Sequence, residues 1–304
     1  MKRIITPLEQ MGAKIEHADF KLPLTFQPSD LTGIYYKSPL ASAQVKSCIL
    51  LAGLFANGET SFEEPYISRD HTELLLKYLG ADIIRNKNRV YIKKSQLVCR
   101  PITVTGDISS AAFFIVAALI TPNSEITIKD VGINPTRTGI IDVLKKMGGD
   151  IEILNEKTIS GEKVGDIRVK HSELKGTTIE GEVIPRLIDE IPVLALAASQ
   201  ANGTTTIKNA QDLKNKETDR INATAEVLRQ IGADITPTED GFIINGKTEL
   251  KGGVSVNSFK DHRIAMTEYI AGLVTQEPVE IKDFEWVDIS FPEFEELICA
   301  LKEE

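Results

Sequence analysis

Positively charged side chains stand at the expected starts of several helices, where cations are normally avoided. A cation there opposes the helix macrodipole at a cost of about 0.3–1 kcal/mol. Unpaired backbone N–H groups next to a cation form an anion site. A single such residue would be an ordinary solvated surface cation, but a set of them in an acidic chain predicts a cleft. Helix N-termini of two lobes would gather there around a small, multiply anionic substrate. The set is Arg69, Arg186, Lys216, Arg220, His262 and Arg263.

Two carboxylates accompany these cations. Asp189 lies in PRLIDEIP at the start of an apolar helix, and Glu217 lies between Lys216 and Arg220 in KETDR. An acid beside cations stays ionised, whereas partial burial raises its pKa toward the range of general acid–base catalysis. Structural roles remain open as alternatives, namely a helix N-cap for Asp189 and an intrahelical ion pair for Glu217.

The motifs of nucleotide-dependent, metal-dependent and serine-hydrolase chemistry are absent from the sequence. There is no Walker A loop, no G-x-G-x-x-G after a strand, no H-E-x-x-H and no nucleophile elbow. The four histidines are too scattered for a metal-ligand pattern. We therefore expect phosphate recognition by cations and backbone, without ATP, metal or another cofactor.

Composition limits the class of protein. The chain has 304 residues, of which 42% are apolar and 26% charged, which is typical of a globular protein with two lobes. The net charge of −9 disfavours a nucleic-acid partner. No apolar run approaches the ~20 residues of a membrane span. Three unclustered cysteines, Cys48, Cys99 and Cys299, fit a reducing cytoplasm better than a disulfide framework or a zinc site.

Two phrases alternate along the chain as an internal repeat. The first reads as a surface helix stopped by glycine and followed by a strand, since glycine suits the left-handed position after a helix. Its copies are LEQMGAKI (8–15), LKYLGADI (76–83), LKKMGGDI (144–151) and LRQIGADI (228–235). The second reads as an apolar, buried helix followed by a turn and a strand. Its copies begin at residues 42, 108, 188 and 261. The repeat predicts α/β units of roughly 70 residues, with a further surface helix at the C-terminus.

The motifs that carry these residues resemble one enzyme family over essentially the whole chain. They are SAQVK (42–46), SRDHTE (68–73), GDISSAAFF (106–114), IPRLIDEIP (184–192), KNKETDRI (214–221) and DHRIAM (261–266). Together they are similar to those of the 5-enolpyruvylshikimate-3-phosphate synthases, and KETDR combined with DHRIAM is the most specific part.

This resemblance implies a fold, a reaction and a cellular setting. The fold is α/β, a two-lobed inside-out α/β barrel of pseudo-repeated units, with the first lobe incomplete. Residues 1–105 would be the remnant of the N-terminal lobe and 106–304 the C-terminal lobe. The reaction transfers the enolpyruvyl group of phosphoenolpyruvate to the 5-hydroxyl of shikimate 3-phosphate and releases phosphate. It belongs to the shikimate pathway of aromatic amino acid biosynthesis. The resemblance further implies a cytoplasmic monomer without cofactor, nucleic-acid partner or membrane partner.

The resemblance also implies site residues for shikimate 3-phosphate. Ser42, Ala43 and Gln44 would hold this substrate, and Arg69 would add charge at its phosphate. Asp189 would contact the hydroxyls and act as the base at the attacking 5-hydroxyl. Lys216 would lie at the same substrate and take part in proton transfer.

A second set of residues is implied for phosphoenolpyruvate. Glu217 would deliver and remove the proton at the methylene carbon. Arg220 and Arg263 would clamp the substrate, with His262 and Gln44 nearby.

The chain departs from the family pattern at its N-terminus and near its C-terminus. The family's Lys-Ser pair with a following Arg, its Asn-x-Gly-Thr loop and the Arg of its Arg-Pro-Met motif do not occur. By the repeat count we expect roughly 120 residues to be missing. Ile289 stands where some members have a lysine. We therefore expect this chain alone to be inactive and to expose apolar surface. Two alternatives stay open: a non-catalytic fragment that binds anions or a complementary chain, and a UDP-N-acetylglucosamine enolpyruvyl transferase.

Overall fold

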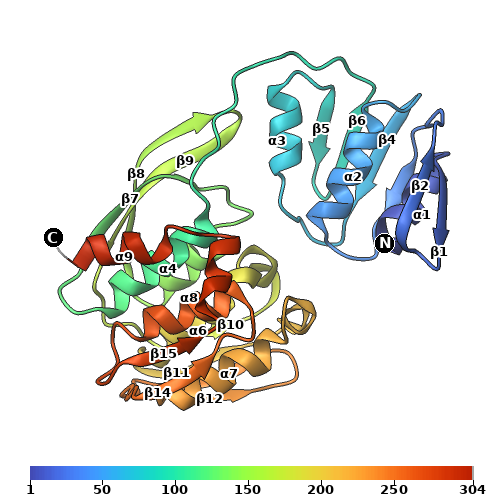
Figure 1. Ribbon diagram of the computed structural model, residues 1–304. Coiled ribbons are helices and arrows are strands. Elements are labelled where there is room, and N and C mark those ends of the chain that lie inside the picture. Colours follow the sequence, from blue (N-terminus) through green and yellow to red (C-terminus); the bar gives the residue numbers. More distant parts are fainter. Residues whose placement is uncertain (303–304) are drawn as a thin grey trace. The chain divides into compact units, whose positions relative to one another are not determined.

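The computed structural model describes residues 1–302, which form two compact units (Figure 1). Unit 1 comprises residues 1–104 and 158–163, and unit 2 comprises residues 105–157 and the chain from Val164 onward. The predicted lobes were residues 1–105 and 106–304. Residues 158–163 fall in the second predicted lobe, whereas in the structure they pack with unit 1. No helix within residues 1–302 is long and apolar enough to cross a membrane.

The predicted surface helices and their glycine stops are confirmed. They are α1 (Lys2–Gln10), α3 (His71–Tyr78), α5 (Gly139–Lys146) and α7 (Arg220–Ile231). After each helix comes a glycine with positive φ, at 98°, 93°, 97° and 120° for Gly12, Gly80, Gly148 and Gly232. A side chain would be strained in this conformation, so glycine ends the helix and turns the chain into a strand. These strands are β1 (Lys14–Ala18), β5 (Ile83–Asn86), β8 (Asp150–Ile159) and β12 (Asp234–Pro237).

The second phrase forms helices α2 (Ala43–Gly53), α4 (Ile108–Ile120), α6 (Ile191–Ser199) and α8 (His262–Ala271). The strands that follow them are β4 (Glu59–Glu63), β7 (Glu125–Gly132), β11 (Gly203–Ile207) and β15 (Val279–Lys282). Complete burial is confirmed for α6, and only Ser110 of α4 escapes it. For α2 the prediction is wrong, because Leu51 and the following Phe55 are 48% and 73% exposed. In unit 1 this helix therefore buries one face only.

The sheets repeat the same pairing in both units. Strands β3 (Tyr35–Lys37), β4, β6 (Arg89–Lys93) and β5 form one sheet in that order. Strands β10 (Thr178–Ile179), β11, β13 (Phe242–Gly246) and β12 form another. In each sheet the first pair is parallel and the other two are antiparallel. The smaller sheets are β1–β2 (Lys21–Gln27), β7–β9 (Glu162–Lys170)–β8 and β14 (Val254–Asn257)–β15. The repeated topology explains the repeated sequence.

Unit 2 has helices in its centre and sheets around them. Helices α4, α6 and α8 pack against one another, and Figure 1 shows the strands outside them. The helix α9 (Phe294–Lys302) confirms the predicted C-terminal helix, and its Phe294 packs edge-on against Phe113 and Phe114 of α4. Short 3₁₀ segments also occur in the connections, at Gly181–Arg186, Ile188–Glu190, Gln211–Asn215 and Phe284–Ile289. This inside-out arrangement places the N-termini of apolar helices where polar loops meet.

Gly33 of unit 1 and Gly176 of unit 2 allow the backbone to approach a neighbouring segment closely at equivalent places of the repeat. A Cβ at Gly176 would lie 2.4 Å from the carbonyl oxygen of Thr204, and one at Gly33 would lie 2.3 Å from that of Glu59. Both glycines precede the parallel strand pair of their sheets, so the close approach is part of the repeat. Neither carbonyl group can move away without disrupting the hydrogen bonds between the strands of its sheet.

We predict that Gly176→Ala lowers the free energy of unfolding by about 1–3 kcal/mol, because the methyl group must displace backbone. Urea denaturation followed by circular dichroism measures this change. Lys175→Ala, at the exposed neighbouring position, serves as the control. An unchanged midpoint for Gly176→Ala would contradict the steric explanation.

Glu268 lies in the middle of α8 and is completely buried. Neither of its carboxylate oxygens has a hydrogen-bond partner within residues 1–302. Burial raises the pKa of Glu268 to about 8. The side chain is therefore protonated at neutral pH and carries a polar group into an apolar core.

We predict that Glu268→Gln removes a pH dependence of stability. An unfolded glutamate has a pKa of about 4.3, below that in the folded state, so the unfolded chain releases this proton first as the pH rises. The free energy of unfolding of the unmodified chain should fall between about pH 4.5 and 8, by up to about 1.4 kcal/mol per pH unit from this group. Above pH 8 the decline should level off.

Urea denaturation at intervals from pH 5 to 9 measures this slope. Glu226→Gln, on the exposed face of α7, is the matched control and should keep the slope. A Glu268→Gln variant with the same pH dependence as the unmodified chain would show that Glu268 is ionised in the folded state.

Candidate functional site

The first turn of α2 in unit 1 contains three of the predicted site residues. Ser42 is the N-cap, and its hydroxyl accepts a hydrogen bond from the backbone N–H of Val45 at 3.5 Å. Ala43 is half-buried and Gln44 is exposed. The turn is therefore ordered by its cap while its outer groups stay accessible. The cap also gives Ser42 a structural role besides the predicted binding role.

Arg69 lies in the same unit, directly before Asp70, the N-cap residue of α3. The residue before it, Ser68, is held against α2, because the Lys46 ammonium donates to the Ser68 carbonyl at 3.1 Å. The structure thus brings the segment containing Arg69 to α2, whose N-terminal turn carries the three other predicted residues.

Asp189 of unit 2 faces cations. Its Oδ1 accepts a hydrogen bond from the Lys216 ammonium at 2.8 Å and lies 3.6 Å from Nη1 of Arg220. The Asp189 side chain is 13% exposed. The N-cap alternative for Asp189 is wrong, because Glu190 occupies the cap position of α6. Its carboxylate is therefore committed to the charge cluster.

Arg220, the first residue of α7, is almost completely buried and surrounded by acids. Its Nε donates to Asp261 at 2.8 Å, and its Nη2 donates to Glu217 at 2.6 Å and to Asp261 at 3.1 Å. The ion-pair alternative for Glu217 is therefore found, although Glu217 precedes the helix and its side chain is 50% exposed. Arg220 therefore forms ion pairs with three carboxylates, those of Asp189, Glu217 and Asp261.

Asp261 and Glu190 join the charge cluster, although neither was among the residues predicted from the sequence. Asp261 is fully buried, pairs with Arg220 and caps α8 by accepting from the Arg263 N–H at 2.9 Å. Its position before an apolar helix is an N-cap signal that could have been recognised. No comparable signal marks Glu190, whose carboxyl group is buried among cations from other elements.

Glu190 connects three helix starts. Its carboxylate accepts a hydrogen bond from Ser109 of α4 and lies 3.7 Å from Arg137 and 3.8 Å from Arg263. Burial raises the pKa of Glu190, while the two arginines act in the opposite direction. Arg263 also donates to the backbone carbonyl of Asp189 at 3.3 Å. This network fixes the backbone that carries Asp189.

The expectation of unpaired N–H groups at the cationic helix starts is wrong for parts of α7 and α8. Asp219 accepts from the N–H groups of Ile221 and Asn222 at 3.1 and 3.2 Å, and Asp261 caps α8 as described. An anion in this cluster would therefore be bound chiefly by side chains.

Arg186 does not join this cluster through its side-chain bonds. It donates to Asp142 and to the carbonyl of Pro135, both at 2.6 Å.

His262 is the first residue of α8. Burial and the neighbouring Arg263 lower the pKa of His262, so the ring is neutral at pH 7. Ile289 is 69% exposed.

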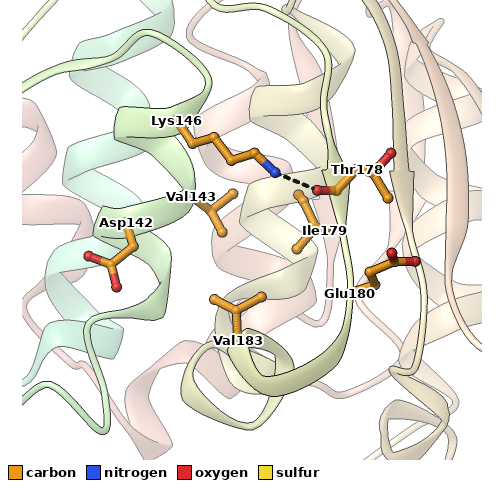
Figure 2. Close-up of a pocket in the computed structure, with 7 residues that line it drawn as sticks. All are labelled: Asp142, Val143, Lys146, Thr178, Ile179, Glu180 and Val183. Atoms are coloured by element: carbon orange, nitrogen blue, oxygen red, sulfur yellow. Dashed lines mark hydrogen bonds between the residues drawn. The ribbon is translucent and has the colours of Figure 1, made fainter.

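A separate pocket of about 350 Å³ lies between α5 and the segment 178–183 (Figure 2). Lys146 reaches across it and donates to the Thr178 carbonyl at 2.9 Å. The pocket contains none of the predicted site residues. Within residues 1–302 no three His, Cys, Asp or Glu side chains are placed to hold a metal ion.

Comparison with known proteins identifies the family. The family model for EPSP synthase (3-phosphoshikimate 1-carboxyvinyltransferase) matches residues 1–298. The 3-phosphoshikimate 1-carboxyvinyltransferase of Petrotoga mobilis is 54% identical over 99% of this chain and 71% of its own length. That of Thermoanaerobacter sp. is 55% identical over 97% of this chain and 70% of its own length. The expected loss of N-terminal residues stays a prediction.

Solved structures agree with the family match. EPSP synthase from Acinetobacter baumannii aligns with a TM-score of 0.92 at 45% identity, covering 99% of this chain and 70% of that one. The enolpyruvyl transferase NikO from Streptomyces tendae aligns with a TM-score of 0.81 at 18% identity and covers 99% of this chain and 71% of its own, a likeness of fold alone. The predicted inside-out α/β fold is confirmed. The identities of 54% and 55% to 3-phosphoshikimate 1-carboxyvinyltransferases favour the EPSP synthases over the UDP-sugar transferase alternative. The chain belongs to the EPSP synthase family.

Proposed function

We propose that this chain transfers the enolpyruvyl group of phosphoenolpyruvate to the 5-hydroxyl of shikimate 3-phosphate and releases phosphate. The observation that carries the proposal is the 2.8 Å pair of Asp189 and Lys216 beside the buried Arg220. It combines a carboxylate able to accept a proton with cations able to bind a polyanion. The family match supports the same reaction. The proposal therefore departs from the expectation, drawn from the sequence, that this chain alone is inactive.

Asp189 is the base in this proposal. The attacking hydroxyl must lose its proton as its oxygen bonds to C2 of phosphoenolpyruvate, and a carboxylate held by Lys216 is oriented to take it. Lys216 stabilises the ionised Asp189 before the reaction. Protonation of Asp189 weakens its pairing with Lys216, whose ammonium can then donate a hydrogen bond to the substrate. The proton on Asp189 passes to the departing phosphate.

Glu217 transfers the proton at C3 of phosphoenolpyruvate in this proposal. Addition requires a proton at C3 of phosphoenolpyruvate, and elimination of phosphate removes one from the same carbon. Glu217 is half-exposed at the edge of the cluster, 2.6 Å from Arg220, so it can reach a ligand there. Arg220 and Arg263 bind the carboxylate and phosphate of phosphoenolpyruvate, with neutral His262 beside them.

The phosphate of shikimate 3-phosphate is assigned to unit 1. Ser42, Ala43 and Gln44 present the first turn of α2, where backbone N–H groups favour an anion. Arg69 supplies the positive charge. A cytoplasmic, monomeric enzyme is part of the same proposal.

Calorimetric titration with shikimate 3-phosphate, followed by phosphoenolpyruvate and an assay of phosphate release, tests the proposal. Saturable binding of the first ligand and phosphate release dependent on both ligands support it. Binding without turnover would match the alternative of a non-catalytic fragment. Binding of neither ligand by a folded chain would overturn the proposal.

We predict that Asp189→Asn lowers kcat for phosphate release by about 10²–10⁴-fold, the usual contribution of a general base. The amide keeps the shape but accepts no proton. It also weakens the contact with Lys216, so the affinity for shikimate 3-phosphate should fall as well. This loss of affinity should be much smaller than the loss of kcat. Steady-state kinetics with both substrates varied separates the two effects.

Asp150→Asn is the matched control, since Asp150 is exposed at the start of β8. Its kinetic constants should equal those of the unmodified chain. An Asp189→Asn variant that keeps its kcat would exclude Asp189 as the base.

A further inference from the structure

Unit 1 contains a buried ionic cluster that the proposed reaction does not use. Lys46 lies one turn into α2, and its side chain is 1% exposed. Its ammonium donates to Glu64 at 2.9 Å and lies 2.9 Å from a Glu73 oxygen. A third bond, at 3.1 Å, goes to the Ser68 carbonyl. All three donor positions of the ammonium are therefore committed, and Lys46 cannot contact a substrate.

Glu64 holds the same residue from the other side. Its side chain is fully buried, and its two oxygens accept from the backbone N–H of Ser68 at 3.0 Å and from the Ser68 hydroxyl at 2.5 Å. Lys46 binds the carbonyl of Ser68, so every polar group of this residue has a partner in the cluster. Ser68 directly precedes Arg69.

Glu73 fixes the helix after Arg69. It lies in the first turn of α3, accepts from Nε of Arg85 at 2.8 Å and shares Lys46 with Glu64. Arg85 comes from β5. The hydroxyls of Ser47 and Thr72, 2.6 Å apart, add a direct bond between α2 and α3. The segment 68–73 is therefore tied to α2 on both sides of Arg69.

Burying such charges does little for stability by itself. The cost of desolvating two carboxylates and an ammonium offsets their attraction, and apolar replacements of buried pairs are often neutral or stabilising. What the cluster does supply is a defined geometry, since each bond has one direction and one partner. The group whose position it defines is the residue between the tied ones, Arg69.

We propose that Lys46, together with Glu64, is a positioning residue that holds Arg69 against the first turn of α2 for the phosphate of shikimate 3-phosphate. This inference rests on the proposed function and deepens it. Lys46 acts through Ser68 and Arg69 and does not touch the ligand. Its contribution should therefore vanish when the Arg69 side chain is removed.

A double-mutant cycle on binding tests this dependence. Lys46→Met keeps the length of the side chain and removes the ammonium. We expect Lys46→Met to weaken the binding of shikimate 3-phosphate by about tenfold in the unmodified chain and by less than about twofold in an Arg69→Ala background, because coupled neighbours are non-additive. Titration calorimetry gives the four dissociation constants, and circular dichroism confirms that each variant is folded.

Lys77→Met is the control, since Lys77 is exposed on α3, and it should leave binding unchanged in both backgrounds. Glu64→Gln repeats the cycle with a neutral side chain of nearly the same shape, and it replaces Lys46→Met if that variant does not fold. Equal losses with and without Arg69, or no loss at all in folded variants, would overturn the inference. Failure of the unmodified chain to bind the ligand would instead overturn the proposed function, and this inference with it.

Discussion

The pairing of Arg220 with Asp261 is the interaction on which the chemistry of unit 2 depends. Both side chains are almost completely buried, so neither charge could persist without the other. The pair joins the starts of α7 and α8, since Asp261 also caps α8. Arg220 then presents its remaining edge to Glu217 and Asp189. Loss of Arg220 would leave Asp261 as an unpaired charge in the core and remove the cation that binds Glu217 and lies beside Asp189.

The inside-out arrangement explains why such a pair can exist. Helices α4, α6 and α8 are surrounded by protein, so their polar starts are the places where charge can be concentrated under partial burial. Glu190 shows the same principle, since it holds Ser109, Arg137 and Arg263 at three helix starts. In unit 1 the ammonium of Lys46 performs the equivalent task for α2 and α3. The buried acids and cations thus hold one another in place, and the exposed polar groups remain to bind substrates.

The sequence predicted the local elements well, because the repeat, the glycine stops and the apolar helices are encoded within short segments. It also placed Asp189, Lys216, Glu217 and Arg220 among the candidates. It did not predict which charges pair, since Asp261 lies 41 residues from Arg220 and their contact depends on how α7 packs against α8. Arg186 was grouped with the binding cations but binds Asp142. The exposed face of α2 was missed because a small-residue helix has the same composition whether one face or all are covered.

The most direct test of the account follows the carbon proton assigned to Glu217. Addition and elimination at the same double bond convert C3 of phosphoenolpyruvate into a methyl group and back, so solvent hydrogen must enter that carbon. The chain is incubated in deuterium oxide with both substrates, and the vinyl group of the product is examined by nuclear magnetic resonance. The account predicts deuterium at C3, dependent on shikimate 3-phosphate. A product with unlabelled C3, or no product from a folded chain that binds both ligands, would contradict it.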